Sequence, residues 1–189
     1  MTAATIGPNA VVQLGEALRA EGLDDLARAI FTAAGHREWL AAAPRSMLAE
    51  REVARLHDAL WALAPQALPL AREAGRRTAD YILANRIPRA ARWLLAVLPS
   101  SMAEPLLVHA IARHAWTFAG SGRFVIEQGR PSRFAVTANP LARAAEDGHC
   151  FWHEAVFTRL WQRLIDPRAQ VVETRCGHGV GACRFEVRR

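Results

Sequence analysis

The spacing of apolar residues changes about two-thirds of the way along the chain, and this change constrains the fold more than any other feature. In the first part apolar residues recur at intervals of three and four, as in Val11, Leu14 and Leu18, which is typical of a helix with one buried face. After residue 122 the apolar run 124–126 and the alternating segment 133–137 are typical of strands. The chain therefore predicts an α+β fold, with a helical N-terminal part followed by an antiparallel sheet.

Proline and glycine mark where these elements end. We expect helices over 47–63, 70–85, 89–98 and 103–119, with the last stopped by a Gly-Ser-Gly sequence. Two hairpins are expected, one from 123–128 and 133–137 and the other from 170–175 and 182–187. An apolar helix over 150–165 separates the two hairpins, so helices pack with a sheet of two hairpins.

The composition is that of a globular protein, because 51% of the 189 residues are hydrophobic and 22% are charged. No apolar run approaches the roughly 18 residues that a membrane-spanning helix requires, so no transmembrane segment is expected. The N-terminus lacks the basic cluster and apolar core of a signal peptide. We therefore expect a cytoplasmic protein.

All 24 basic residues are arginine, and they are unevenly distributed. Residues 1–70 hold 6 arginines against 8 acidic residues, whereas residues 71–189 hold 18 against 10. A biased genome explains the absence of lysine but not this asymmetry, which favours a ligand with carboxylates or phosphates. The arginines are scattered along helices rather than interleaved with aromatic residues, so no nucleic-acid partner is expected.

Cys150, Cys176 and Cys183 are the only cysteines, and an odd number without a secretion signal argues against a disulfide framework. Three thiolates and a fourth ligand would complete a tetrahedral zinc site. Ordinary buried thiols are the alternative. Residues that compete for the fourth position are Glu173, His149, His153 and His178.

Glu173 and Cys176 do not share a face of a regular strand, so a bulge or the strand end would have to bring them together. The nearby sequence Gly-His-Gly-Val-Gly at 177–181 joins two antiparallel strands and opens no helix. It therefore lacks the context of a dinucleotide site. No catalytic triad or Gly-x-Ser-x-Gly sequence is present either.

Two histidines, His109 and His114, occur on an apolar helix close to Trp116 and Phe118. Such histidines are commonly hydrogen-bonded core residues. Their other interpretation is a site for a large flat apolar ligand, in which an imidazole contacts a central metal and the rings pack on the macrocycle.

Three stretches resemble a known family: Tyr-Ile-Leu-Ala-Asn-Arg-Ile-Pro at 81–88, His-Ala-Trp-Thr-Phe-Ala-Gly-Ser-Gly-Arg-Phe at 114–124, and Val-Glu-Thr-Arg-Cys at 172–176 with Cys-Arg-Phe at 183–185. Together they look like the 4-vinyl reductase domain family, and in particular its bacteriochlorophyll-biosynthesis branch. The domain-level resemblance covers 100–189, which leaves 1–99 as a helical N-terminal part of the same globular unit.

The resemblance implies a small-molecule-binding fold, often a homodimer, which in related sensor domains holds zinc through one Cys, one Glu and two further Cys. The matching positions are Cys150, Glu173, Cys176 and Cys183. The family name implies NAD(P)H-dependent reduction of the 8-vinyl group of divinyl protochlorophyllide. No dinucleotide, flavin or iron–sulfur motif is present, however.

We therefore expect a tetrapyrrole-binding accessory or carrier protein with a structural zinc site, rather than the reductase. A ligand-sensing module without its own output domain is a third interpretation. The ligand would be a porphyrin or magnesium porphyrin, with tetrapyrrole-pathway enzymes as partners and a location peripheral to photosynthetic membranes. Guanidinium groups would pair with its carboxylates, and the predicted ligand-binding residues are His109, His114, Trp116, Phe118, Arg76 and Arg89.

Overall fold

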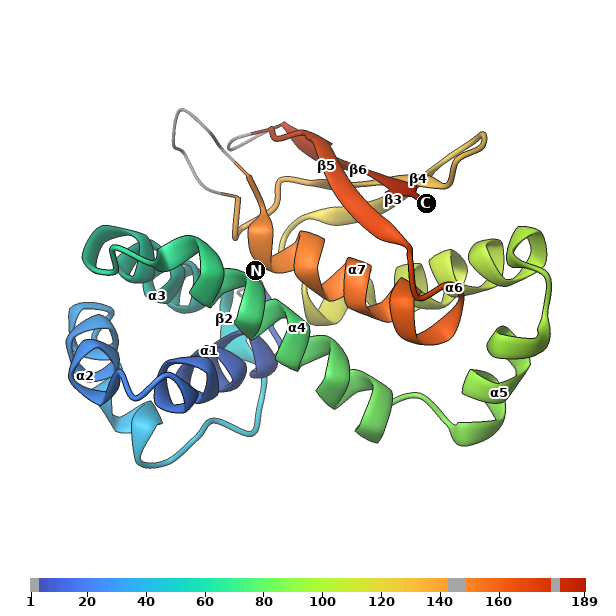
Figure 1. The fold of residues 1–189 in the computed structure, drawn as a ribbon. Coiled ribbons are helices and arrows are strands. Elements are labelled where there is room, and N and C mark those ends of the chain that lie inside the picture. Colours follow the sequence, from blue (N-terminus) through green and yellow to red (C-terminus); the bar gives the residue numbers. More distant parts are fainter. Residues whose placement is uncertain (1–3, 143–148, 178–180) are drawn as a thin grey trace.

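An antiparallel sheet lies on one side of helix α7 (Phe151–Leu164), and helix α4 (Ala67–Asn85) lies on the other (Figure 1). The computed structural model describes residues 4–142, 149–177 and 181–189. Helices and an antiparallel sheet thus share one structure, which confirms the predicted α+β fold class.

Both predicted hairpins are present, and they join into one sheet. The sheet of the described residues has four strands in the order β3-β4-β6-β5, all antiparallel. Cys183, Phe185 and Val187 alternate as buried residues along one strand, so one sheet face packs on α7 while the other faces solvent. The strands are β3 (Arg123–Glu127), β4 (Arg133–Thr137), β5 (Gln170–Arg175) and β6 (Ala182–Arg188).

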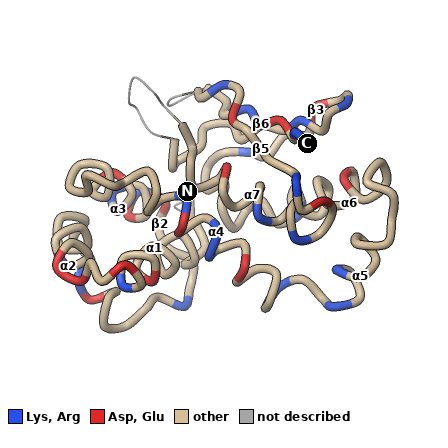
Figure 2. Tube along the Cα trace, in the orientation of Figure 1, with Lys and Arg blue, Asp and Glu red and all other residues tan. Residues whose placement is uncertain are grey.

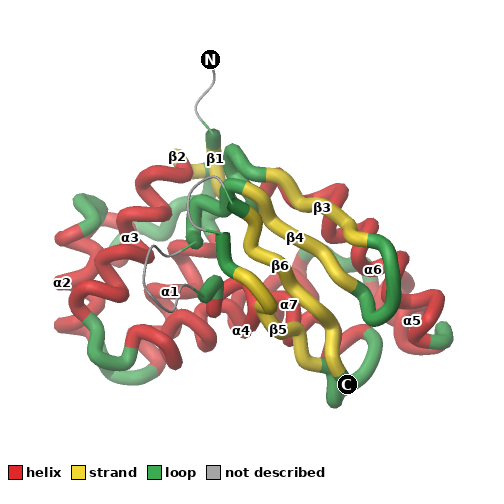
Figure 3. The backbone as a smooth tube through the Cα atoms, turned by 90° about the horizontal axis from the view of Figure 1, so that it is seen from above, coloured by secondary structure: helices red, strands yellow, loops and turns green. Residues whose placement is uncertain are grey.

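The N-terminal helices lie away from the sheet (Figure 3); those over 9–20 and 50–63 pack against α4, and the one over 24–33 packs on these two. The helix predicted over 47–63 is shorter than expected, because Leu48 and Ala49 pair with Thr5 and Ile6 as two short strands. The helix begins only after this pairing ends, at Glu50. The elements of this part are β1 (Thr5–Ile6), α1 (Asn9–Ala20), α2 (Asp24–Ala33), the 3₁₀ helix η1 (Arg37–Leu40), β2 (Leu48–Ala49) and α3 (Glu50–Leu63).

A glycine allows α4 and α7 to pack closely. A Cβ atom at Gly75 would lie only 2.4 Å from the carbonyl oxygen of Trp152, so any other residue would force the helices apart. Across this contact the core is continuous, from Ile6 near one terminus to Val187 near the other. The division into residues 1–99 and 100–189 stays a prediction.

Helices α5 (Arg89–Val97) and α6 (Ser100–His114) lead from α4 to the sheet. The helix predicted over 103–119 begins earlier, because Pro99 provides its N-cap. It ends in a 3₁₀ turn, η2 (Ala115–Thr117). Figures 1 and 3 both show α5 at the opposite end of the molecule from α2. Among the described helices, none combines the length and the apolar character needed to cross a bilayer.

Candidate functional site

Three separate elements bring the cysteine sulfurs together. Cys150 precedes α7, Cys176 follows β5, and Cys183 lies in β6. The Sγ–Sγ distances are 3.0 Å for Cys150–Cys183, 3.5 Å for Cys176–Cys183 and 3.8 Å for Cys150–Cys176. With a carboxylate oxygen of Glu173, all four ligand atoms lie within 4.8 Å of one another. Zinc–sulfur bonds of about 2.3 Å in a tetrahedron separate sulfurs by about 3.8 Å, so these four residues could hold a metal ion with little movement.

A β-bulge gives Glu173 and Cys176 access to the same point. Glu173 is opposite Phe185 in the β5–β6 pairing, but the register then shifts, so that Arg175 is opposite Arg184. Of the two alternatives expected from the sequence, a bulge or the strand end, the structure has the bulge. Gly177 follows directly. A Cβ atom there would lie 2.2 Å from the backbone nitrogen of Ala182, so only glycine fits beside the third ligand.

The carboxylate of Glu173 is buried and incompletely hydrogen-bonded. Its Oε2 atom accepts a hydrogen bond from the backbone N–H of Cys150 and lies 3.3 Å from Nδ1 of His149. Its Oε1 atom is buried without a hydrogen-bond partner among the described residues. Burial raises the pKa of Glu173 to about 7. A buried oxygen without a partner is costly, and a bound cation would both satisfy it and favour its ionised form.

The thiols interact strongly with one another. Hydrogen bonds from the Cys150 and Cys176 thiols lower the pKa of Cys183, whereas hydrogen bonds with Cys176 and Cys183 raise the pKa of Cys150. The cluster therefore favours one thiolate that shares the protons of its neighbours. A metal ion would replace these protons, since the ligand form of cysteine is the thiolate.

Asn139 is a residue of the cluster that sequence reasoning missed. Its Nδ2 atom lies 3.1 Å from Sγ of Cys150 and 3.6 Å from Sγ of Cys183. Its Oδ1 atom accepts a hydrogen bond from the backbone of Leu141, which fixes the amide orientation. Ala138 just before it has φ = 44°, a left-handed conformation that is uncommon for residues other than glycine. The only signal in the sequence is a polar residue after a strand.

The histidines considered for the fourth position do not join the four ligand atoms. His149 contacts the carboxylate of Glu173 instead. His153 is buried, and its Nδ1 atom lies 3.3 Å from Nδ2 of Asn139. Burial lowers the pKa of His153 to about 4, so the ring is neutral and Nδ1 accepts this hydrogen bond. His178 lies outside the described residues.

The six residues predicted to bind a ligand do not gather in one place. His109, His114 and Trp116 are exposed on α6 and η2, with 62% of Trp116 accessible to solvent. Phe118, by contrast, is partly buried against the core, and its ring lies 5.9 Å from that of Phe157. Arg89 is exposed at the start of α5.

Arg76 borders a groove of about 610 Å³ between α4, α7 and β5. It is held by Glu73 and Asp80 on its own helix. The other two arginines of the groove are paired in the same way, Arg72 with Glu154 and Arg159 with Asp80. The charges of these three guanidinium groups are thus already neutralised by the protein.

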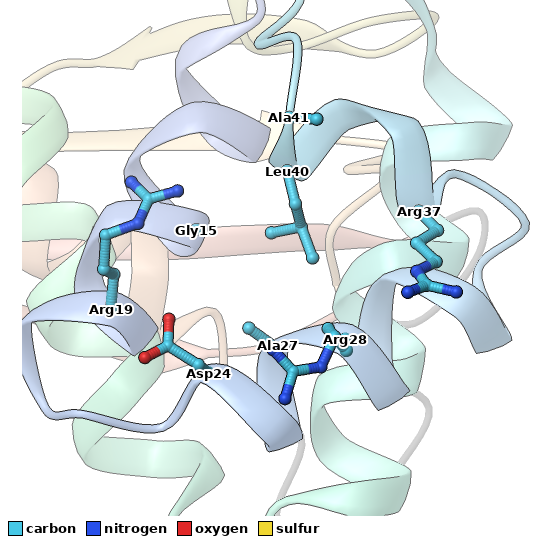
Figure 4. A pocket seen from close by; sticks show the side chains of 8 residues that line it. All are labelled: Gly15, Arg19, Asp24, Ala27, Arg28, Arg37, Leu40 and Ala41. Carbon is cyan, nitrogen blue, oxygen red and sulfur yellow. The ribbon is translucent and has the colours of Figure 1, made fainter.

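A second, smaller hollow of about 290 Å³ lies between α1, α2 and η1. Figure 4 shows Arg19 and Arg37 on opposite sides of it and Leu40 between them. Pockets for drug-sized ligands usually measure about 300–1,000 Å³, so this hollow is too small to enclose a macrocycle.

His109 has a hydrogen bond that defines its tautomer. Its Nδ1 atom lies 2.7 Å from the carbonyl oxygen of Pro105. Because a carbonyl can only accept, Nδ1 carries the proton in the neutral ring and Nε2 holds the lone pair. Histidines that bind metals are commonly oriented by such a bond. The exposed Nε2 atom of His109 is therefore prepared to act as a ligand.

Solved structures with a similar fold come from the H-NOX family. One, studied for haem distortion, has a TM-score of 0.58 and 11% identity and covers 96% of this chain and 93% of its own. Another, studied for haem redox potential and porphyrin distortion, has a TM-score of 0.53 and 10% identity, with coverage of 93% and 94%. At these identities the likeness shows a shared fold.

Two proteins related by sequence are far more similar to this chain than these solved structures are. The chain is 44% identical over 187 residues to the bacteriochlorophyll synthase 23 kDa chain of Cereibacter sphaeroides, which covers 96% of this chain and 89% of that protein. It is 50% identical over 113 residues to the protein of the same name in Rhodobacter capsulatus, covering 59% and 53%. No protein-family profile matches the chain. The identity to the Cereibacter sphaeroides protein confirms the resemblance to the bacteriochlorophyll-biosynthesis branch: the chain belongs to the family of bacteriochlorophyll synthase 23 kDa chains.

Proposed function

We propose that this protein binds a tetrapyrrole intermediate of bacteriochlorophyll biosynthesis and carries it between enzymes of the pathway, while its cysteine cluster holds a structural zinc ion. Membership in the family of bacteriochlorophyll synthase 23 kDa chains supports the role in this pathway. The shared fold with proteins studied for haem and porphyrin distortion supports a tetrapyrrole as the class of ligand.

The imidazole of His109 is the observation that carries the proposal. Its Nδ1 proton is held by the carbonyl of Pro105, so Nε2 is free to bind a metal. Leu106, one turn earlier on α6, is half exposed, and Trp116 lies exposed beyond the end of the helix. An imidazole lone pair beside apolar side chains matches a magnesium porphyrin, whose centre takes an axial ligand and whose faces are apolar.

The other predicted residues take different roles. His114, Trp116 and Phe118 stay predicted ligand-binding residues: the first two are exposed, whereas Phe118 is partly buried against the core. Arg89 has no ion-pair partner among the described residues, so it remains available for a ligand carboxylate. Arg76 is occupied by Glu73 and Asp80 and would have to leave them first.

A titration with two ligands tests this proposal. Magnesium protoporphyrin and metal-free protoporphyrin are each added to the purified protein, and the shift of the porphyrin absorption band is followed. We expect saturable binding of both, with His109→Ala weakening the magnesium form more than tenfold and leaving the metal-free form nearly unchanged. His36→Ala, which alters a histidine in the loop between α2 and η1, is the matched control. No saturable shift would refute the carrier role, and an equal loss for both ligands would refute axial ligation by His109.

The same protein should be incubated with divinyl protochlorophyllide and NAD(P)H. Formation of the reduced product by pure protein would overturn the carrier role in favour of a vinyl reductase. The homodimer and the enzyme partners implied by the resemblance stay predictions, which sedimentation and pull-down with pathway enzymes can test.

Zinc is the metal that the cluster suits best. Three sulfurs and one carboxylate oxygen form a closed tetrahedral set, and thiolate ligands select zinc over magnesium or calcium. Buried Oε1 of Glu173, which has no other partner in the described residues, supports occupancy. Metal analysis of protein purified without added zinc should give one zinc per chain. Metal-free protein of unchanged stability would identify the thiols as ordinary core residues.

A further inference from the structure

Helix α5 presents an apolar face to solvent. Trp93 is 68% exposed, and Leu94 and Val97 on the same helix are about half exposed. Met102, at the start of α6, is 55% exposed and extends the face. We call these four residues the α5 face. The helix buries only Leu95 in return, so its exposed apolar side chains are not explained by packing within the chain.

Positive charge surrounds the α5 face. Arg86 follows α4, and Arg89 and Arg92 lie on α5. None of the three forms an ion pair with any described residue, in contrast to the arginines of the groove between α4 and α7. No Asp or Glu occurs anywhere in residues 81–103. Figure 2 shows the arginines of α5 at the outer edge of the molecule. The α5 face therefore complements a partner that is both apolar and anionic.

We propose that the α5 face docks this protein on an anionic lipid bilayer. Tryptophan, aliphatic and arginine side chains on one short helix are typical of helices that lie in the membrane interface, with apolar side chains among the acyl chains and guanidinium groups on the phosphates. The position of α5 at one end of the molecule allows contact with a flat surface (Figures 1 and 3).

This inference goes beyond tetrapyrrole binding and does not depend on it. It requires neither His109 nor the cysteine cluster, and the test contains no tetrapyrrole. Arg89 is left unchanged in the test because it is assigned to the tetrapyrrole ligand. Failure of vesicle binding would therefore leave the carrier role standing, and failure of porphyrin binding would leave this inference standing.

The test is co-sedimentation of the full chain with vesicles. One set contains phosphatidylcholine alone, and the other contains equal parts of phosphatidylcholine and phosphatidylglycerol. We expect at least tenfold stronger partitioning to the anionic vesicles, decreasing as salt is added. The double variant Arg86→Glu/Arg92→Glu should lose at least tenfold of this partitioning, and Trp93→Ser/Leu94→Ser should lose a similar factor.

Matched variants at the other end of the molecule control for net charge and general hydrophobicity. Arg45→Glu/Arg55→Glu likewise changes two arginines to glutamate, and Leu63→Ser removes a half-exposed leucine of α3. Both should keep wild-type partitioning, with circular dichroism showing that every variant is folded. Equal losses in test and control variants, or equal binding to both vesicle types, would overturn the proposal. So would a dimer that Trp93→Ser dissociates, because a second copy would then cover the face.

Discussion

The cysteine cluster surrounds its polar atoms with protein, whereas the α5 face leaves large apolar side chains in solvent. In the cluster, ligands from three elements meet within 4.8 Å, and Asn139 directs its amide at two of the sulfurs. On α5, Trp93 is 68% exposed and only Leu95 is buried. The cluster thus connects three elements of the chain, while the α5 face contributes little to folding and is available to a partner.

A single ligand substitution should produce the largest effect. Cys176 is only partly buried, so Cys176→Ser removes a metal ligand with little loss of packing. We expect it to lower the free energy of unfolding by about 4 kcal/mol when free zinc exceeds its dissociation constant a thousandfold. Urea unfolding with and without a chelator measures this. The variant and the wild type should agree when the chelator is present, and a difference that persists there would contradict a metal-based cause.

The second-largest effect is expected when the protein is acidified, because a buried histidine must then take up a proton. Burial lowers the pKa of His57 from 6.5 to about 4, so the unfolded chain binds a proton that the folded chain excludes. Stability is then complete above pH 6.5 and decreases as the pH falls toward 4, by about 3 kcal/mol for this group.

His57→Gln removes this titration, and its side-chain amide can still donate to the carbonyl oxygen of Ala10 that His57 contacts. Its unfolding free energy should fall less steeply between pH 6.5 and 4 than that of the wild type. Burial also lowers the pKa of His153 to about 4. The part of the acid-induced loss of unfolding free energy that comes from His153 therefore remains in the variant. Parallel pH profiles for variant and wild type would contradict the assignment to His57.

Loss of the Asn139 amide should have a moderate effect. Asn139→Ala removes the donor to the sulfurs of Cys150 and Cys183 and the acceptor for the Leu141 backbone. We expect a loss of about 2 kcal/mol in unfolding free energy and faster release of zinc to a coloured chelator. Zinc release at the wild-type rate, with the same loss of stability, would show that Asn139 supports only the backbone turn.

The smallest effect is expected on the α5 face. Trp93→Ser/Leu94→Ser should change the unfolding free energy by no more than about 0.5 kcal/mol per site, because both side chains are largely in solvent. Denaturant midpoints of this variant and the wild type provide the comparison. A loss of several kcal/mol would mean that these residues are buried in the folded protein, for instance by a second copy of the chain.

Local patterns in the sequence predict much of the fold, because helix periodicity and strand alternation report on one buried face at a time. They identify both hairpins and the three cysteines, and they require either a bulge or the strand end to bring Glu173 and Cys176 together, of which the structure has the bulge. The choice of Glu173 as the fourth ligand comes from the family resemblance instead. The pairing of β4 with β6 is different, since it joins residues such as Phe134 and Phe185 that are far apart in the chain. The same holds for β1 with β2, whose two-residue strands are too short to show alternation.

Local patterns are limited in the same way for the site residues, because they do not show which residues meet in the folded chain. Cysteines are rare enough that their positions suggest a shared site, whereas Asn139 becomes important only through a turn that Ala138 makes in a left-handed conformation. His109 and Phe118 occur on one apolar stretch, yet His109 is exposed and Phe118 is partly buried against the core. Helix periodicity does not continue through the 3₁₀ turn between them, so the pattern alone does not separate surface from interior there.

The position of β6 between β4 and β5 has a consequence for the order of folding. Each hairpin can form from residues that are close in the chain. The pairing of β6 with β4 is different, because it joins residues that are far apart in the chain. Cys176 and Cys183 belong to the β5–β6 hairpin, so their sulfurs can meet before β6 pairs with β4, and the sulfur of Cys150 joins them once α7 has packed on β5. The proposed zinc site therefore needs only this hairpin and α7 in place, so the rate of metal capture would report when α7 has packed on the sheet.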